Sequence, residues 1–253
     1  MAYLVPTEFV TKMVDAGESK IFMSTRDTLI RAYAQPEEAW TRLLKQFAAE
    51  LEAHDDDAIE RVRVTAMDEA RAFWSDRAAA AKWRLDIPTA RRLSVRRALA
   101  RLDRADEALA DRIADAFSEM RRNEYRLYPD AHATVDALRT AGVKLALVTN
   151  GAGETQRAKI ERFDLGHRFD HIQIEGEFGQ GKPELAVYRH ALERLGVAAS
   201  DAWMVGDNYE WEVVAPQQLG MCGIWYDPFE AGVPAHATAR PTRIIKRLGE
   251  LVE

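Results

Sequence analysis

Apolar residues follow one spacing in residues 36–125 and a different spacing from residue 127 onward. In the first stretch they recur three and four positions apart, which is the spacing of one helix face. The clearest set is Trp40, Leu43, Leu44, Phe47 and Leu51, with Pro36 in the first turn, where its missing N–H costs nothing. Further stripes continue to residue 120, so we expect residues 36–125 to form a small helical bundle.

From residue 127 onward, short apolar runs alternate with segments of helical pattern. The runs occupy residues 143–148, 171–174, 202–205 and 221–225. The helices are predicted at residues 131–140, 154–163, 184–195 and 211–219. Such alternation predicts βαβ units and a parallel sheet. With a further run at 21–23, the fold class is α/β, a Rossmann-like doubly wound parallel sheet with an inserted helical bundle. We divide the chain into residues 1–35, 36–125 and 126–253.

Composition narrows the kind of partner. The 253 residues are 47% hydrophobic and carry a net charge of −6, which argues against a nucleic-acid partner or an anionic membrane surface. We therefore expect a small molecule as the partner. The single cysteine, Cys222, lies in an apolar run and has no second cysteine to pair with, which suits a reducing cytoplasm. No run approaches 18 consecutive apolar residues, and the start of the chain lacks a secretory pattern, so we expect a cytoplasmic protein.

Polar groups follow the predicted strands, at the edge where parallel sheets bind ligands. Thr149 ends the run at 143–148, and its hydroxyl, with the N–H groups of Asn150 and Gly151, suits phosphoryl oxygens at a helix start. An ordinary turn is the alternative interpretation of Thr-Asn-Gly. Lys182, between a glycine and a proline, is either a fixed cation of the same site or a solvated loop lysine.

Asp207 gives the strongest signal of the three positions. It follows the apolar run at 202–205, and Glu210 and Glu212 come three and five residues later. A carboxylate at a strand end, followed by more carboxylates, suits Mg²⁺, which prefers a few oxygen ligands and keeps its waters. The alternative is that Asp207 caps the following helix.

In this order, Thr149, Lys182 and Asp207 with Glu212 resemble the second, third and fourth motifs of the haloacid dehalogenase-like (HAD) hydrolase superfamily. The resemblance covers roughly residues 21–250. It implies a HAD-like core, a helical cap at residues 36–125, Mg²⁺ as cofactor, and hydrolysis of a small phosphate ester through an aspartyl-phosphate. In that chemistry one aspartate attacks phosphorus, and a second aspartate two residues later is the general acid and base.

The first motif of that family is an apolar strand followed by Asp-x-Asp-x-Thr-Leu, and the matching stretch here is Ser24-Thr-Arg26-Asp-Thr-Leu29. Ser24 and Arg26 replace the two aspartates, so the charge rises by one and two units. Because Arg26 repels a cation, we expect weakened Mg²⁺ binding and impaired catalysis, although Arg26 and Lys182 still attract a phosphate dianion. Asp15, which no convincing strand precedes, is the one alternative carboxylate.

Residues 1–33 resemble the cytoplasmic start of formate/nitrite transporters, but no apolar membrane helix follows them. A gene fusion is one explanation, and a short amphipathic helix at residues 5–15 is another. Three functions stay open: an active hydrolase, a phosphate-binding pseudoenzyme or interaction protein, and a non-functional fusion product. An arginine-rich helix within the predicted cap has two interpretations, a salt-bridged solvated face or attraction of a substrate anion: Arg91, Arg92, Arg96, Arg97, Arg101 and Arg104.

Overall fold

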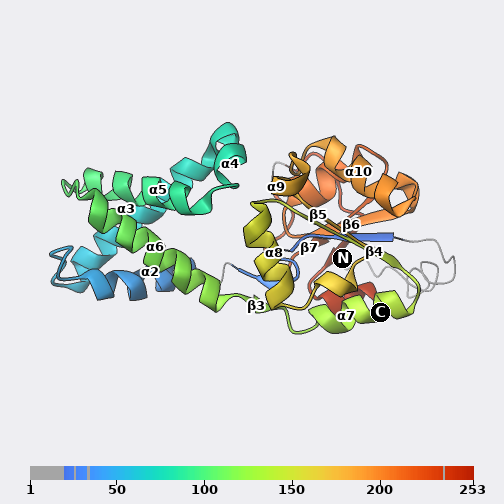
Figure 1. The fold of residues 1–253 in the computed structure, drawn as a ribbon, viewed down its shortest axis with the longest axis horizontal. Helices are drawn as coiled ribbons and strands as arrows, with labels where there is room; N and C mark the ends of the chain where they lie inside the picture. The colour runs from blue at the N-terminus through green and yellow to red at the C-terminus, as the bar shows by residue number, and fades with distance from the viewer. Residues whose placement is uncertain (1–19, 26, 33–34, 236) are drawn as a thin grey trace. The chain divides into compact units, whose positions relative to one another are not determined.

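The computed structural model describes residues 20–25, 27–32, 35–235 and 237–253. The transporter-like stretch, Asp15 and Arg26 therefore lie outside the described residues. The chain divides into two compact units (Figure 1). One contains the residues up to Arg31 and those from Leu127 to Glu253, and the other spans Ala32–Arg126. Within the described ranges, no helix is both long and apolar enough to cross a membrane.

A six-stranded parallel sheet organises the first unit, which confirms the predicted α/β fold class. The strand order is β5-β4-β1-β6-β7-β8, so β1 lies in the middle, between β4 and β6. The strands are β1 (Lys20–Met23), β4 (Lys144–Thr149), β5 (His171–Ile174), β6 (Ala202–Gly206), β7 (Cys222–Tyr226) and β8 (Arg243–Ile245).

Helices cover both faces of this sheet, which is why its central strands are apolar on both sides. Phe22 pairs in register with Ala146 and Met204, and all three pack against α10 (Leu185–Leu195) in one buried cluster. In Figure 1, α7 (Ala131–Thr140) and the C-terminal end of the chain lie on the opposite side of the sheet from α10. The shorter elements are α8 (Gly153–Arg162), α9 (Glu175–Phe178), η2 (Gly166–Arg168), η3 (Ala199–Asp201) and η5 (Leu248–Leu251).

The helix predicted at residues 211–219 is only partly regular. The chain forms wide π turns over Glu210–Val214 (η4) and then a short α-helix, α11 (Ala215–Gln217). Pro216 has no N–H to donate to the carbonyl four residues earlier, and such a gap favours a π-bulge over regular α turns. Strand β8 and a two-stranded sheet of β2 (Ile30–Arg31) and β3 (Arg126–Leu127) were not predicted, because two or three residues carry too little pattern.

The second unit is a bundle of helices whose starts are set by aspartates. Asp55, Asp76, Asp86 and Asp106 each precede a helix and accept hydrogen bonds from its first free N–H groups. The elements are α2 (Pro36–Leu44), η1 (Lys45–Phe47), α3 (Asp56–Ser75), α4 (Arg77–Trp83), α5 (Ile87–Arg101) and α6 (Glu107–Glu124).

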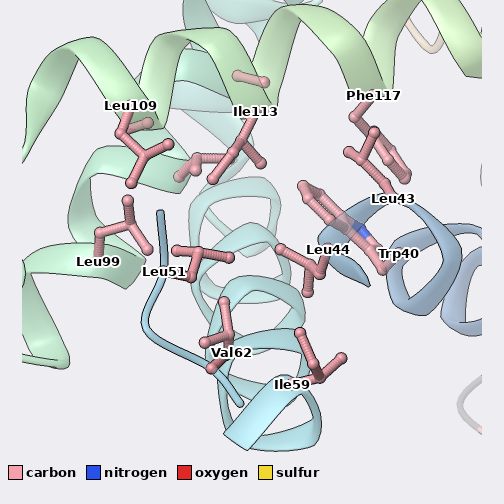
Figure 2. Close-up of a cluster of buried hydrophobic side chains, with 14 of the residues drawn as sticks. Trp40, Leu43, Leu44, Leu51, Ile59, Val62, Leu99, Leu109, Ile113 and Phe117 are labelled. Carbon is pink, nitrogen blue, oxygen red and sulfur yellow. The ribbon is translucent and has the colours of Figure 1, made fainter. Parts of the chain in front are cut away.

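The prediction of one continuous helix through Leu51 is wrong. The α-helix ends at Leu44, a 3-10 turn follows, and Glu52 adopts a left-handed φ of 47° that stops the helical chain. Leu51 is nevertheless fully buried, and Figure 2 shows it among side chains from the other helices. In the same cluster Trp40 stacks on Phe117 with ring centroids 3.9 Å apart.

Candidate functional site

Ser24 lies at the centre of the sheet edge where ligands of α/β folds bind. It directly follows β1, its side chain is largely buried, and its N–H donates to the carbonyl of Val205 on β6 at 3.2 Å. Because β1 has β4 on one side and β6 on the other, groups at the ends of all three strands face one region. The sequence-predicted positions Thr149 and Asp207 follow or end the two flanking strands.

Two hydroxyl contacts tie the segment after β1 to both neighbouring strands. The Oγ1 atoms of Thr25 and Thr149 lie 2.5 Å apart, and Thr28 Oγ1 donates to Asp207 Oδ1 at 3.1 Å. Both Thr25 and Thr28 are fully buried. Thr28 was part of the motif pattern, whereas nothing in the sequence distinguished Thr25. Sequence reasoning therefore missed the contact through which Thr149 is held.

Lys182 and Glu212 form a buried ion pair next to this edge. Their Nζ and Oε1 atoms are 2.7 Å apart, and each side chain is 1% exposed. The second oxygen of Glu212, Oε2, accepts the N–H of Asn208 at 2.8 Å. Burial raises the pKa of Glu212 to about 7, and the nearby ammonium of Lys182 opposes part of that rise. Both oxygens that the sequence interpretation offered to a metal are thus engaged by the protein.

Glu212 has space for its side chain because residue 206 is glycine. A Cβ at Gly206 would lie 2.3 Å from Glu212 Cγ, well inside van der Waals contact. The glycine at the end of β6 is therefore a packing requirement of the buried carboxylate.

Asn150 and Gly151 make contacts other than the predicted phosphate contacts. The N–H of Gly151 donates to Glu175 Oε2 at 2.9 Å, so this donor is already used within the protein. Asn150 binds the main chain of Lys182 twice: its Nδ2 donates to the carbonyl at 2.7 Å and its Oδ1 accepts the N–H at 2.8 Å. The carbonyl of Asn150 accepts Gln156 Nε2 at 2.8 Å.

The acidic groups do not form a recognisable metal cluster. Among the described residues, no group of three or more His, Cys, Asp or Glu is placed to hold a metal ion. Asp207 supplies one carboxylate at the edge, Glu212 is paired with Lys182, and residue 24 is a serine. This donor set does not fit the Mg²⁺ site that the family resemblance implies, since a Mg²⁺ ion held by protein needs carboxylates with free oxygens.

In the helical unit, the arginine-rich helix α5 is a salt-bridged face. Arg92 and Arg96 each form two hydrogen bonds to an aspartate of α6, Asp115 and Asp111. Arg101 pairs with Glu69 at 2.8 Å. The side chains of Arg92 and Arg96 are 42% and 34% exposed, as the solvated interpretation predicts.

A family model described as haloacid dehalogenase-like hydrolase matches residues 26–220. The match begins two residues after Ser24. Over 118 residues the chain is 42% identical to a phosphoserine phosphatase of Thermus thermophilus, covering 47% of each protein. Over 156 residues it is 33% identical to a ribulose-1,5-bisphosphate 5-phosphatase of Halopiger xanaduensis, covering 59% of this chain and 64% of that protein. The chain thus spans about half to two thirds of these relatives.

Solved structures match over nearly the whole chain. The magnesium-bound HAD-hydrolase YfnB of Bacillus subtilis has a TM-score of 0.67 at 20% identity, covering 92% of this chain and 96% of that one. A 2-haloacid dehalogenase of Pseudomonas syringae has a TM-score of 0.60 at 24% identity, with coverage of 92% and 96%. At these identities the likeness establishes a shared fold and leaves the chemistry to the site.

Proposed function

Because the chain belongs to the haloacid dehalogenase-like hydrolase family, we propose that it keeps the family's phosphate-ester site and lacks the aspartyl-phosphate chemistry. The observation that carries the proposal is the position of Ser24. It stands at the carboxyl end of the central strand, where the family motif has its aspartate nucleophile, with Thr149 and Asp207 at the neighbouring strand ends. The scaffold is retained and the reacting carboxylate is absent.

A small phosphorylated molecule is the ligand class that the relatives support. Their names describe phosphatases of phosphoserine, ribulose-1,5-bisphosphate, glyceraldehyde 3-phosphate and N-acylneuraminate 9-phosphate. These four substrates share a phosphate ester and differ in the rest of the molecule. In this chain the hydroxyls of Ser24 and Thr149 and the cation Lys182 are the groups suited to the phosphate part.

Ser24 is a poor replacement for the nucleophile. A serine hydroxyl attacks phosphorus only when a neighbouring base removes its proton. The family places its acid and base two residues after the nucleophile, and that position is Arg26 in this sequence. A guanidinium does not release or accept a proton near neutral pH, so it cannot serve either role. Hydrolysis through a covalent intermediate therefore lacks both of its protein groups.

Magnesium would normally supply charge stabilisation to the phosphoryl group in such a site. Since the donor set here does not fit Mg²⁺, we propose that anion binding depends little on this metal. Calorimetric titration of tungstate with and without Mg²⁺ tests this point. Similar affinities in the two titrations are expected, and a large enhancement by Mg²⁺ would show that Asp207 still holds the metal.

Restoring the motif tests the proposed function as a whole. The double variant Ser24→Asp/Arg26→Asp should gain Mg²⁺-dependent hydrolysis of phosphate esters, while each single variant should gain much less. The Ser24→Asp variant has a nucleophile without an acid for the leaving group, and Arg26→Asp has no carboxylate to phosphorylate. The two changes therefore act as a unit, and their effects should not be additive.

The control is the triple variant that adds Asp207→Asn. It should lose the gained activity because the metal loses a carboxylate ligand. Activity that survives in the triple variant would indicate a contaminating phosphatase. A folded, Mg²⁺-binding double variant without turnover on a broad panel of phosphate esters would contradict the placement of Ser24 at the nucleophile position. High activity of the unchanged chain in the same assay would favour the alternative function, an active hydrolase.

A further inference from the structure

We propose that Asn150 is a positioning residue that holds Lys182 across the carboxyl end of β1. The inference rests on the proposed phosphate site, because Lys182 is the cation of that site. It assigns to the Asn150 side chain a task different from the phosphate contact that its main-chain N–H suggested. The carrying observation is that one side chain binds both polar groups of one buried main-chain unit.

The Asn150 amide and the Lys182 main chain are paired as two amides would pair in a sheet. Nδ2 donates to the Lys182 carbonyl at 2.7 Å and Oδ1 accepts the Lys182 N–H at 2.8 Å. The orientation of the amide follows from its partners, since the flipped form would place N–H against N–H and oxygen against oxygen. Two parallel hydrogen bonds fix both the position and the rotation of the Lys182 main chain.

The other end of Lys182 is fixed on the opposite side of β1. Its Nζ binds Glu212 Oε1 at 2.7 Å, and Glu212 Oε2 is held by the N–H of Asn208, just after β6. Asn150 itself directly follows β4. Because β1 lies between β4 and β6, Lys182 is anchored on both flanking strands. We call this chain of contacts, Asn150–Lys182–Glu212, the Lys182 brace.

The brace needs Asn150 because the segment around Lys182 has no regular structure of its own. Lys182 lies between α9 and α10, outside any helix or strand, and is fully buried. Buried main-chain N–H and C=O groups require partners, and here both partners belong to Asn150. The turn that carries Asn150 is itself held by Gln156, which donates to the Asn150 carbonyl, and by Glu175, which accepts the Gly151 N–H.

The experiment measures sulfate affinity by calorimetry, because sulfate stays doubly charged between pH 4 and pH 8, whereas phosphate titrates. The variant Asn150→Ala should bind sulfate on the order of tenfold more weakly than the unchanged chain, because an ammonium that is displaced by a fraction of an ångström loses directed contacts. The matched control is Gln173→Ala. Gln173 is another buried amide that donates to a main-chain carbonyl, that of Val187, without touching the brace. Its sulfate affinity should stay within about twofold of the unchanged chain.

The variant Asn150→Asp separates positioning from general stability. An ionised aspartate accepts the Lys182 N–H but faces the Lys182 carbonyl with a second acceptor, whereas a protonated aspartate has one donor and one acceptor, as asparagine has. The affinity of Asn150→Asp, divided by that of the unchanged chain at the same pH, should therefore recover as the pH falls from 8 to 5. A ratio that does not change with pH would overturn the proposal.

Hydrogen exchange of the unchanged chain tests the brace without any ligand. The Lys182 N–H should exchange as slowly as the amides of β4, and Asn150→Ala should speed its exchange selectively. Fast exchange of this amide in the folded, unchanged chain would overturn the brace even if sulfate binds. If the unchanged chain binds no sulfate while Lys182 N–H is protected, the proposed function fails and the brace stands. Equal weakening by Asn150→Ala and Gln173→Ala would also count against the positioning role.

Discussion

The two units of this chain use pairs of opposite charge in opposite ways. In the helical unit, Arg96 of α5 binds Asp111 of α6 at 2.6 Å, and both side chains remain about a third exposed, at 34% and 27%. In the sheet unit, Lys182 binds Glu212 at nearly the same distance, 2.7 Å, with each side chain 1% exposed. The contact geometry is similar, and the access of water differs completely.

Access of water decides what each pair contributes. A partly exposed pair keeps much of its hydration and is screened by salt, so its net contribution is about 0–1 kcal/mol. A buried pair has lost its hydration, and most of its attraction offsets that loss. The exposed pairs are thus replaceable one at a time, whereas Lys182 and Glu212 are each required by the other. The comparison gives four predictions.

Breaking the buried pair should have the largest effect on stability. Lys182→Met or Glu212→Gln alone should lower the free energy of unfolding by about 3–5 kcal/mol at pH 8, because each leaves a polar or charged partner buried without its contact. The double variant should lose much less than the sum of the two. Urea denaturation of the four proteins measures this double-mutant cycle. Additive losses would contradict a tightly coupled pair.

The pH dependence of stability should have opposite sign in the two units. The pKa of Glu212 is raised from 4.5 to about 7, mainly by burial. Between these values the folded chain holds a proton that the unfolded chain has released, so stability should fall as pH rises from 5 to 7, by up to about 1.4 kcal/mol per pH unit. In Glu212→Gln this slope should be absent, as denaturation at several pH values would show.

The exposed carboxylate behaves conversely. The hydrogen bond and charge of Arg96 lower the pKa of Asp111 below 3.8. Its contribution is present above the unfolded value and should be lost as the pH falls below about 4. Hydrogen exchange of α5 and α6 between pH 2 and pH 5, in the unchanged chain and in Asp111→Asn, checks the direction. A loss confined to neutral pH would contradict it.

Adding one methyl group next to the buried pair should have an intermediate effect. Gly206→Ala places a Cβ 2.3 Å from Glu212 Cγ and should cost about 1–3 kcal/mol, because the carboxylate or the strand has to move. A matched control is Gly142→Ala, where a Cβ has no neighbour within 4 Å but φ is +81°. If the control loses as much as Gly206→Ala, backbone strain rather than the Glu212 contact explains the cost.

Removing one exposed pair should have the smallest effect. In the double-mutant cycle of Arg96→Ala and Asp111→Ala, we expect a coupling free energy of about 0.2–1 kcal/mol, and it should shrink further in 1 M salt. Thermal unfolding at low and high salt measures both. A coupling as large as that of Lys182 and Glu212 would remove the distinction between the two units.

Much of the fold was readable from the sequence because burial leaves a pattern. The strand at His171–Ile174 and the helix at Ala131–Thr140 have the bounds that the apolar spacing predicts. The errors fall where local chemistry ends a pattern, as at the turn after Leu44 and the π turns before Pro216. Apolar spacing records which side of an element is buried. It does not record which hydrogen bonds close the element.

The sequence by itself determined which chemical groups follow each strand, including a serine and an arginine in place of two aspartates. Parallel strands bring such groups to one edge, so the region of the candidate site was predictable. Only the tertiary structure decided the partners: Asn150 with the Lys182 main chain, Gly151 with Glu175, and Glu212 with Lys182 rather than a metal. These contacts join residues 24 to 32 positions apart, and side-chain reach and burial in the folded chain select among donors that look equivalent in sequence.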